Sequence, residues 1–315
     1  MSQKLSTAIA PAVIATAMFA VVLFTPLTGA GAQPCSNGEA EITLSMYRPE
    51  VGIWYEHTDA CSFTAVRIGG KDHTPAAADY DGDGTLDAAV WSAADRIWQV
   101  RGSKNGAERI LDLSSFEFIS AESIPVPADY DGDGNADIAL WHAPSGEWTL
   151  ILSSNDHSIA DAVRDRWGGY GDIPVQADYD GDGRADLAVF RPTENAWLIL
   201  ESGTQRSIRI EFGKAGEDVL APGDYTGDGR ADIAVFRRGT WFVRNSSTGE
   251  TEPLVFGPAE GSPVPADYDG DGVIDPAVYH NGMWLIYESG APRFTGIEFG
   301  SENDVPISLL VKKTF

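Results

Sequence analysis

Five short segments of the chain are rich in aspartate and glycine, and their carboxylates recur with a fixed spacing. Each segment has nine residues, with aspartate at positions 1, 3, 5 and 9 and glycine at positions 4 and 6, except that Thr226 takes position 3 of the fourth segment. They span residues 79–87, 129–137, 178–186, 224–232 and 267–275. Side chains at alternate positions of a tight turn can converge on one ion, and calcium takes about six to eight oxygen ligands. The spacing therefore predicts a calcium ion in each loop.

The predicted calcium ligands are the aspartates at positions 1, 3, 5 and 9. They are Asp79, Asp81, Asp83, Asp87, Asp129, Asp131, Asp133, Asp137, Asp178, Asp180, Asp182, Asp186, Asp224, Asp228, Asp232, Asp267, Asp269, Asp271 and Asp275. Position 7 varies freely, which indicates that only its backbone carbonyl is used. The loop that begins at Asp224 has one carboxylate fewer and is predicted to bind calcium most weakly.

Two known kinds of calcium loop fit the sequence less well. An EF-hand needs a bidentate glutamate at position 12, where every loop has valine or leucine. Calcium repeats of the β-helix type recur every nine residues, whereas these loops start 50, 49, 46 and 43 residues apart. A turn without metal is the remaining alternative, but its clustered carboxylates would repel one another.

The segments between the loops repeat as well, and they indicate short β-strands. Each loop is followed by an apolar run with an aromatic residue, such as Val189-Phe190, and then by a tryptophan 17 or 19 residues after the first aspartate. The shorter offset indicates a hairpin turn that lacks two residues. In the third repeat the predicted strands cover residues 173–177, 187–191, 197–201 and 207–212. No connection is long enough for a crossover helix, so the strands should form an antiparallel meander.

Four-stranded units of this length have the size of propeller blades, and the chain ends predict how the ring closes. Tyr47-Arg48-Pro49 matches Phe190-Arg191-Pro192, so the N-terminal part has only the last three strands of a repeat. Asp304-Val-Pro-Ile307 matches the start of a repeat, Asp172-Ile-Pro-Val175. The two fragments should form one composite blade without a metal loop. We therefore predict an all-β protein, a β-propeller of six four-stranded blades.

These features resemble the FG-GAP/VCBS repeat family, which includes the propeller of integrin α chains. The aspartate loops match the calcium hairpins of that family, and Phe212-Gly213, Phe256-Gly257 and Phe299-Gly300 end repeats as its members do. The resemblance implies calcium between the first two strands of a blade and an exported adhesion or recognition role. Integrin propellers have seven blades, which keeps seven as the alternative to six.

The N-terminus has the pattern of a secretory signal peptide. Lys4 precedes an apolar stretch over residues 8–27 and small residues that end at Ala32. We predict cleavage after Ala32, so that residues 1–32 are the signal peptide and residues 33–315 the propeller, with an uncleaved membrane anchor as the alternative. The two cysteines, Cys35 and Cys61, are predicted to form a disulfide in an oxidising compartment, with two free thiols as the alternative.

Composition limits the possible partners. The chain has 47 acidic and 22 basic residues and a formal charge of −25. Nucleic acids and anionic membrane surfaces attract basic proteins, so neither is an expected partner. After signal cleavage we expect no membrane insertion, and we expect a secreted or cell-surface monomer.

No catalytic set is evident among the polar residues. The histidines share no repeat position, and the recurring tryptophans are predicted to pack between blades rather than to stack on sugars. Trp167-Gly-Gly-Tyr170 falls outside the repeat pattern and is a candidate for a ligand contact, with a surface loop as the alternative. The sequence thus favours a non-catalytic binding or adhesion module for a glycan or an extracellular protein. The alternative is an extracellular calcium-dependent carbohydrate-active enzyme, similar to a polysaccharide lyase.

Overall fold

The computed structural model describes residues 42–59, 62–116, 119–290, 292–308 and 312–313. They belong to one compact unit, Cys35–Phe315. These residues form β-strands and two short 3-10 helices, and none of their helices could cross a membrane. The predicted signal peptide and the predicted Cys35–Cys61 disulfide lie outside the described residues.

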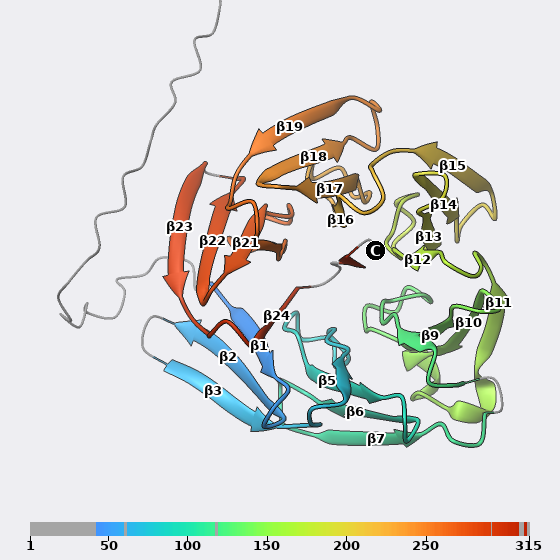
Figure 1. Ribbon diagram of the computed structural model, residues 1–315. Helices are drawn as coiled ribbons and strands as arrows, with labels where there is room; N and C mark the ends of the chain where they lie inside the picture. The colour runs from blue at the N-terminus through green and yellow to red at the C-terminus, as the bar shows by residue number, and fades with distance from the viewer. Residues whose placement is uncertain (1–41, 60–61, 117–118, 291, 309–311, 314–315) are drawn as a thin grey trace, which may run out of the picture. The chain divides into compact units, whose positions relative to one another are not determined.

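The described strands form six antiparallel sheets, arranged as the blades of a propeller (Figure 1). The five internal blades are numbered in chain order, and each runs from its inner strand to its outer strand. Blade 1 has β4 (His73–Pro75), β5 (Ala88–Ser92), β6 (Ile97–Arg101) and β7 (Glu108–Asp112); blade 2 has β8 (Ser123–Pro125), β9 (Ile138–His142), β10 (Glu147–Ile151) and β11 (Val163–Arg166), with the 3-10 helices Ser153–Asn155 and Ile159–Asp161 before β11. Blade 3 has β12 (Ile173–Pro174), β13 (Leu187–Arg191), β14 (Ala196–Leu200) and β15 (Ser207–Glu211); blade 4 has β16 (Val219–Leu220), β17 (Ile233–Arg237), β18 (Thr240–Arg244) and β19 (Thr251–Val255); blade 5 has β20 (Ser262–Pro263), β21 (Ala277–His280), β22 (Met283–Glu288) and β23 (Arg293–Glu298).

The sixth blade is composite, as predicted from the chain ends. It contains β24 (Val305–Ile307), β1 (Leu44–Arg48), β2 (Ile53–Asp59) and β3 (Ser62–Arg67), in that order. β24 pairs antiparallel with β1, with Met46 opposite Pro306. A strand from the C-terminal part therefore closes the ring, and the described blades number six. A further short strand, β25 (Lys312–Lys313), pairs with β16.

All four strands predicted for blade 3 are present, and the second has the predicted bounds. The third begins and ends one residue earlier than predicted, the fourth ends one residue earlier, and the first is shorter. β12 ends at Pro174. Toward the loop the pairing continues through a hydrogen bond from the Val175 N–H to the Ala188 carbonyl and an isolated bridge between Ala177 and Asp186. Proline has no N–H to donate, so it suits an inner strand that lacks a partner on one edge. The short inner strands leave the residues just before each loop free to line the centre of the ring.

The recurring aromatic residues form a pair in every blade. The aromatic residue of the second strand lies directly opposite the tryptophan of the third, as Phe190 lies opposite Trp197. In blade 3 the two ring centroids are 5.8 Å apart. Trp197 is fully buried, and so are its counterparts in the other internal blades. Trp197 shares one hydrophobic cluster with Ile233 and Val235 of blade 4, so the prediction that these tryptophans pack between blades is confirmed for blade 3.

The predicted shortening of one hairpin turn is also confirmed. In blade 4 only Arg238 and Gly239 separate the paired residues Arg237 and Thr240, and both have positive φ. A two-residue turn with two positive φ angles matches the right-handed twist of the strands that it joins. In blade 3 the corresponding turn has four residues, between Arg191 and Ala196.

An ion pair holds the inner strand of three blades to the second strand. Arg48 of β1 donates to both carboxylate oxygens of Asp304, at 2.6 and 2.7 Å. Asp304 is buried and also accepts hydrogen bonds from the backbone N–H and hydroxyl of Ser301. Arg191 makes the same pair with Asp172, and Arg237 makes it with Asp218. In the composite blade this contact joins opposite ends of the chain.

We expect Asp304→Ala to lower the free energy of unfolding by about 2 kcal/mol, because Arg48 and Ser301 lose a shared buried acceptor. The full cost of breaking a buried pair does not apply, since the Arg48 side chain is 37% exposed. Urea denaturation measures the change. Glu194→Ala removes an exposed partner of Arg191 and should change stability by less than about 0.5 kcal/mol. Equal stability of the Asp304→Ala and unmodified proteins would contradict this role.

Candidate metal centre

Each aspartate loop joins the first and second strands of an internal blade and folds around its own first carboxylate. In blade 3, Asp178 accepts hydrogen bonds from the backbone N–H groups of Gly181 and Gly183, at 2.6 and 2.8 Å. Both glycines have positive φ, at 75° and 85°, a conformation that is costly for other residues. The position-1 aspartates of the other loops accept the same two bonds: Asp79, Asp129, Asp224 and Asp267.

The position-1 residue also links neighbouring blades. Its backbone carbonyl accepts a hydrogen bond from the N–H at position 8 of the next loop. Four such bonds, of 2.6–2.7 Å, join the five loops: Ala136 to Asp79, Ala185 to Asp129, Ala231 to Asp178 and Ile274 to Asp224. Whatever holds the position-1 carboxylate in place therefore also holds the contact between blades.

The position-9 aspartate is fully buried at the base of the loop. In blade 3 one carboxylate oxygen of Asp186 accepts from the N–H of Tyr179, and the other accepts from the N–H of Ser202, at 2.8 and 2.6 Å. Burial raises the pKa of Asp137 and of Asp186 to about 6, against the hydrogen bonds from serine and tyrosine N–H groups that lower it. The pKa values of Asp87 and Asp232 are also raised by burial.

Sequence reasoning missed a serine that completes each loop. It lies in the turn between the third and fourth strands, and its N–H binds the position-9 carboxylate in all five internal blades: Ser103, Ser153, Ser202, Ser246 and Ser289. The signal was available, because a serine recurs 16 residues after position 9 in three repeats and 14 residues after it in the two with the short turn.

Three of the loops bring the carboxylates of positions 1, 3 and 9 together. One oxygen from each of the three lies within 4.8 Å of the others in the groups Asp79/Asp81/Asp87, Asp129/Asp131/Asp137 and Asp178/Asp180/Asp186. The position-5 carboxylate instead accepts a hydrogen bond from the hydroxyl of this serine. In blade 3 the Ser202 hydroxyl donates to Asp182 at 3.0 Å. Position 5 thus lies outside these three groups.

The last two loops differ from this arrangement. In the fifth, the Ser289 hydroxyl donates to Asp275 at 2.7 Å, and Asp271 joins Asp267 and Asp269 within 4.8 Å. In the fourth, which has Thr226 at position 3, the described residues form no group of three carboxylates. This loop has no such group because Thr226 replaces the position-3 aspartate, the same replacement that led us to predict the weakest calcium site there.

The donor set fits a hard divalent cation. Both carboxylate oxygens of Asp81 are buried and have no hydrogen-bond partner. Buried acceptors without a partner are costly, and like charges this close repel each other unless a cation neutralises them. Asp79, Asp81 and Asp87 would hold such an ion in the first loop, with oxygen as the only ligand atom. The bound ion would supply charge neutralisation to these carboxylates.

The composite blade leaves a gap in the series of loops. A cavity of about 520 Å³ lies there, lined by Asp79 and Thr85 of the first loop, Asp269 of the fifth, and Ser45 and Ser308 of the composite blade. Among the described residues, the position-1 to position-8 bonds join the five internal loops.

Trp167 does not lie outside the repeat, contrary to our interpretation of the sequence. Its backbone carbonyl accepts the indole N–H of Trp148, as the carbonyl of Phe212 accepts that of Trp197. Gly168 follows it with positive φ, like Gly213. Trp167-Gly168 thus replaces the Phe-Gly pair in blade 2, and the interpretation failed because a larger aromatic residue takes the place of phenylalanine.

In the calcium-free protein we expect the free energy of unfolding to fall as pH rises from about 4 to about 7. The native state binds more protons than the unfolded state between the usual aspartate pKa of 3.8 and the folded value of about 6 of Asp137 and Asp186. The loss should be on the order of 6 kcal/mol, about 3 kcal/mol for each of the two aspartates. Saturating calcium should reverse the trend, because protons compete with the ion. Chemical denaturation of metal-stripped protein across this range measures it.

Asp137→Asn removes one of the titrating groups and should flatten the pH dependence. A metal-free protein that becomes more stable from pH 4 to pH 7 would contradict the raised pKa values.

Comparison with known proteins identifies the repeats. The family model for the FG-GAP-like repeat matches residues 129–189 and 178–235. Among curated proteins, no sequence matches significantly.

Solved structures show the same fold at low sequence identity. An Agrocybe aegerita lectin that recognises non-reducing terminal N-acetylglucosamine has a TM-score of 0.54 and 17% identity, over 82% of this chain and 76% of the lectin. TolB from Acinetobacter baumannii has a TM-score of 0.55 and 13% identity, over 87% of this chain and 65% of TolB. A streptogramin B lyase has a TM-score of 0.51 and 9% identity, over 85% of this chain and 87% of the lyase.

At these identities the structural likeness shows the fold alone. The residues that the family model matches include the aspartate loops of blades 2, 3 and 4. Residues 129–235 therefore match FG-GAP-like repeats, and the described residues fold as a six-bladed β-propeller.

Proposed function

We propose that this protein is an exported calcium-binding propeller that acts as a non-catalytic binding or adhesion module for a glycan or an extracellular protein. The observation that carries the calcium part is the convergence of three carboxylates in each of four loops, with both Asp81 oxygens buried and unpaired. The FG-GAP-like repeats and the signal-peptide pattern of residues 1–32 support export.

Calcium suits these loops better than the other common divalent ions. The candidate ligands are all oxygens, whereas zinc sites use cysteine and histidine. Magnesium requires near-ideal octahedral geometry and keeps much of its water, while calcium accepts irregular sets of carboxylates. Extracellular calcium modules bind at roughly 10⁻⁴–10⁻³ M, so export and weak calcium sites are mutually consistent.

In this proposal the ions are structural, and they prepare a rigid surface for a partner. Every position-1 aspartate faces its own loop through its carboxylate, and four of the five also face the next blade through the backbone carbonyl, as Asp178 does. An ion in one loop would therefore stabilise the contact with the next blade as well. A rigid ring lowers the entropy that its exposed loops lose on binding.

Removal of calcium should lower the melting temperature by roughly 10–20 °C. At about tenfold saturation each independent site adds about 1.4 kcal/mol, so five sites add about 7 kcal/mol. Thermal melts with excess calcium and with a chelator measure the shift. A melting temperature that does not respond to the chelator would contradict the proposal.

The fourth loop offers a matched pair of variants. Thr226→Asp restores the missing carboxylate and should increase calcium affinity at that site about tenfold, as seen in a calcium titration followed by calorimetry. Asp224→Asn should abolish binding there and leave the other four loops loaded. An unchanged titration for both variants would contradict the assignment of this loop as the weakest site.

Two measurements distinguish a binding protein from an enzyme: retention of the protein on an immobilised glycan or protein, and release of product from a polysaccharide. We expect the calcium-loaded protein to be retained on a glycan or protein array and to release no unsaturated product from plant or bacterial polysaccharides. Chelation should abolish retention, because the loops lose their order. Product formation without retained binding would instead support the carbohydrate-active enzyme.

A further inference from the structure

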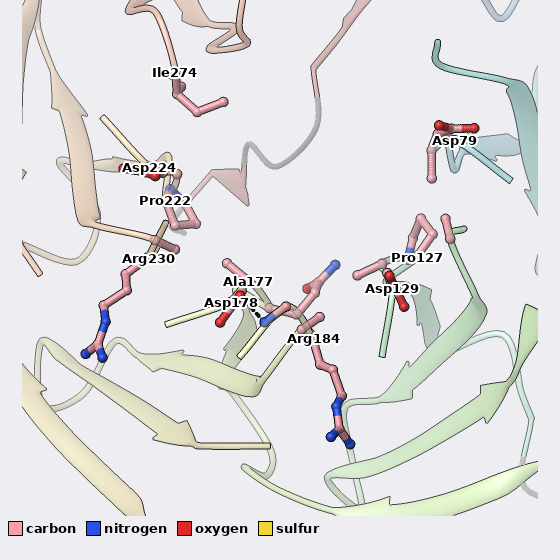
Figure 2. A pocket seen from close by; sticks show the side chains of 18 of the residues that line it. Asp79, Pro127, Asp129, Ala177, Asp178, Arg184, Pro222, Asp224, Arg230 and Ile274 are labelled. Carbon is pink, nitrogen blue, oxygen red and sulfur yellow. Dashed lines mark hydrogen bonds between the residues drawn. The ribbon is translucent and has the colours of Figure 1, made fainter. Parts of the chain in front are cut away.

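The centre of the ring contains a second feature that the metal loops do not account for. A cavity of about 490 Å³ is lined by the loops of blades 1–5 and by the residues just before them. Figure 2 shows Pro127 and Pro222 at this cavity, with four of the position-1 aspartates nearby, while the guanidinium groups of Arg184 and Arg230 extend away from it.

One position of the repeat breaks the pattern in this cavity. It lies two residues before the first loop aspartate and is small or proline in the other internal blades. The residues at this position are Ala77, Pro127, Gln176, Pro222 and Pro265, with Ser308 in the composite blade. Gln176 alone has a side-chain amide there. Since alanine and proline serve in the other blades, the fold does not require an amide at this place.

The Gln176 amide is buried without a partner. The residue is 0% exposed, and neither its side-chain oxygen nor its side-chain nitrogen has a hydrogen bond. By contrast, Ser308 at the equivalent position donates to the carbonyl of Pro265 at 2.6 Å. A buried amide with neither of its functions satisfied destabilises a protein, so its presence indicates a role other than folding.

We propose that the central cavity is a binding site for a small neutral ligand that carries a carboxamide, with Gln176 as the residue that recognises it. The glutamine amide presents one acceptor and one donor group side by side, and another carboxamide presents the complementary pair. Pro127, Pro222 and Ala77 supply apolar contacts for the rest of the ligand.

Charge in the cavity favours a neutral ligand. Asp79, Asp129, Asp178 and Asp224 line the same space and disfavour an anion. Their carboxylates already accept backbone N–H groups of the loops, which leaves glutamine as the recognition group. An acetamido sugar and a simple amide share the required chemistry. This inference goes beyond the proposed function, because it assigns a small ligand to the central cavity and does not depend on which glycan or protein the propeller binds elsewhere.

The test follows the side-chain amide resonance of Gln176 in nitrogen-15 spectra of the calcium-loaded full chain. N-acetylglucosamine has a sugar ring and an amide, N-methylacetamide has the amide alone, and glucose has neither amide nor charge. We expect the Gln176 resonance to shift with at least one of the two amides and not with glucose. A shift with N-acetylglucosamine alone identifies an acetamido sugar, and a shift with N-methylacetamide indicates that a simple amide suffices.

Two variants test the role of the amide. Gln176→Ala should weaken binding of the responding amide at least tenfold in calorimetry and raise the melting temperature without ligand, because the unpaired amide is removed. Pro265→Ala alters the same ring of residues at a position to which no ligand contact is assigned, and it should keep the affinity within twofold. The proposal is overturned if neither amide shifts the resonance, if glucose shifts it equally, or if Gln176→Ala lowers the melting temperature.

Discussion

The architecture depends on one residue per loop, the aspartate at position 1. Its carboxylate accepts the N–H groups of two glycines in its own loop, as Asp178 does with Gly181 and Gly183. In four of the five loops its carbonyl also accepts an N–H from the next blade, as Asp178 does from Ala231. The loop structure and the contact between blades therefore both depend on this one aspartate. A cation that neutralises the clustered carboxylates would stabilise both at once. In this account the stability of the ring therefore depends on bound calcium.

The series of aspartate loops is interrupted at the composite blade, where the two ends of the chain meet. The described residues of the composite blade include no aspartate loop, and this blade is held together by strand pairing and an ion pair: β24 pairs with β1, and Arg48 binds Asp304 across the two ends of the chain. A pair of the same kind, Arg191 with Asp172, occurs in blade 3, where it joins neighbouring strands of one continuous repeat. The ring is thus closed by an ordinary intra-blade contact whose two halves come from distant parts of the sequence.

Much of the fold could be predicted because each blade repeats its chemistry at fixed offsets. Phe190 and Trp197 lie opposite each other on paired strands, so the number of residues between them in the sequence indicates the length of the hairpin turn. Backbone bonds between loops have no side-chain signature, and the sequence could not reveal them. Trp167 was misread because the replacement of phenylalanine by tryptophan hid its repeat position. The unpaired amide of Gln176 became evident only when burial and hydrogen bonding were known.

The most direct test of the central claim is the calcium stoichiometry of the folded protein, measured by native mass spectrometry during a calcium titration. The account predicts up to five ions per chain, with four bound first and the fifth, in the Asp224 loop, only at higher calcium. A protein that stays folded and binds no calcium ion at millimolar concentration would contradict it, because the clustered carboxylates would then need no cation.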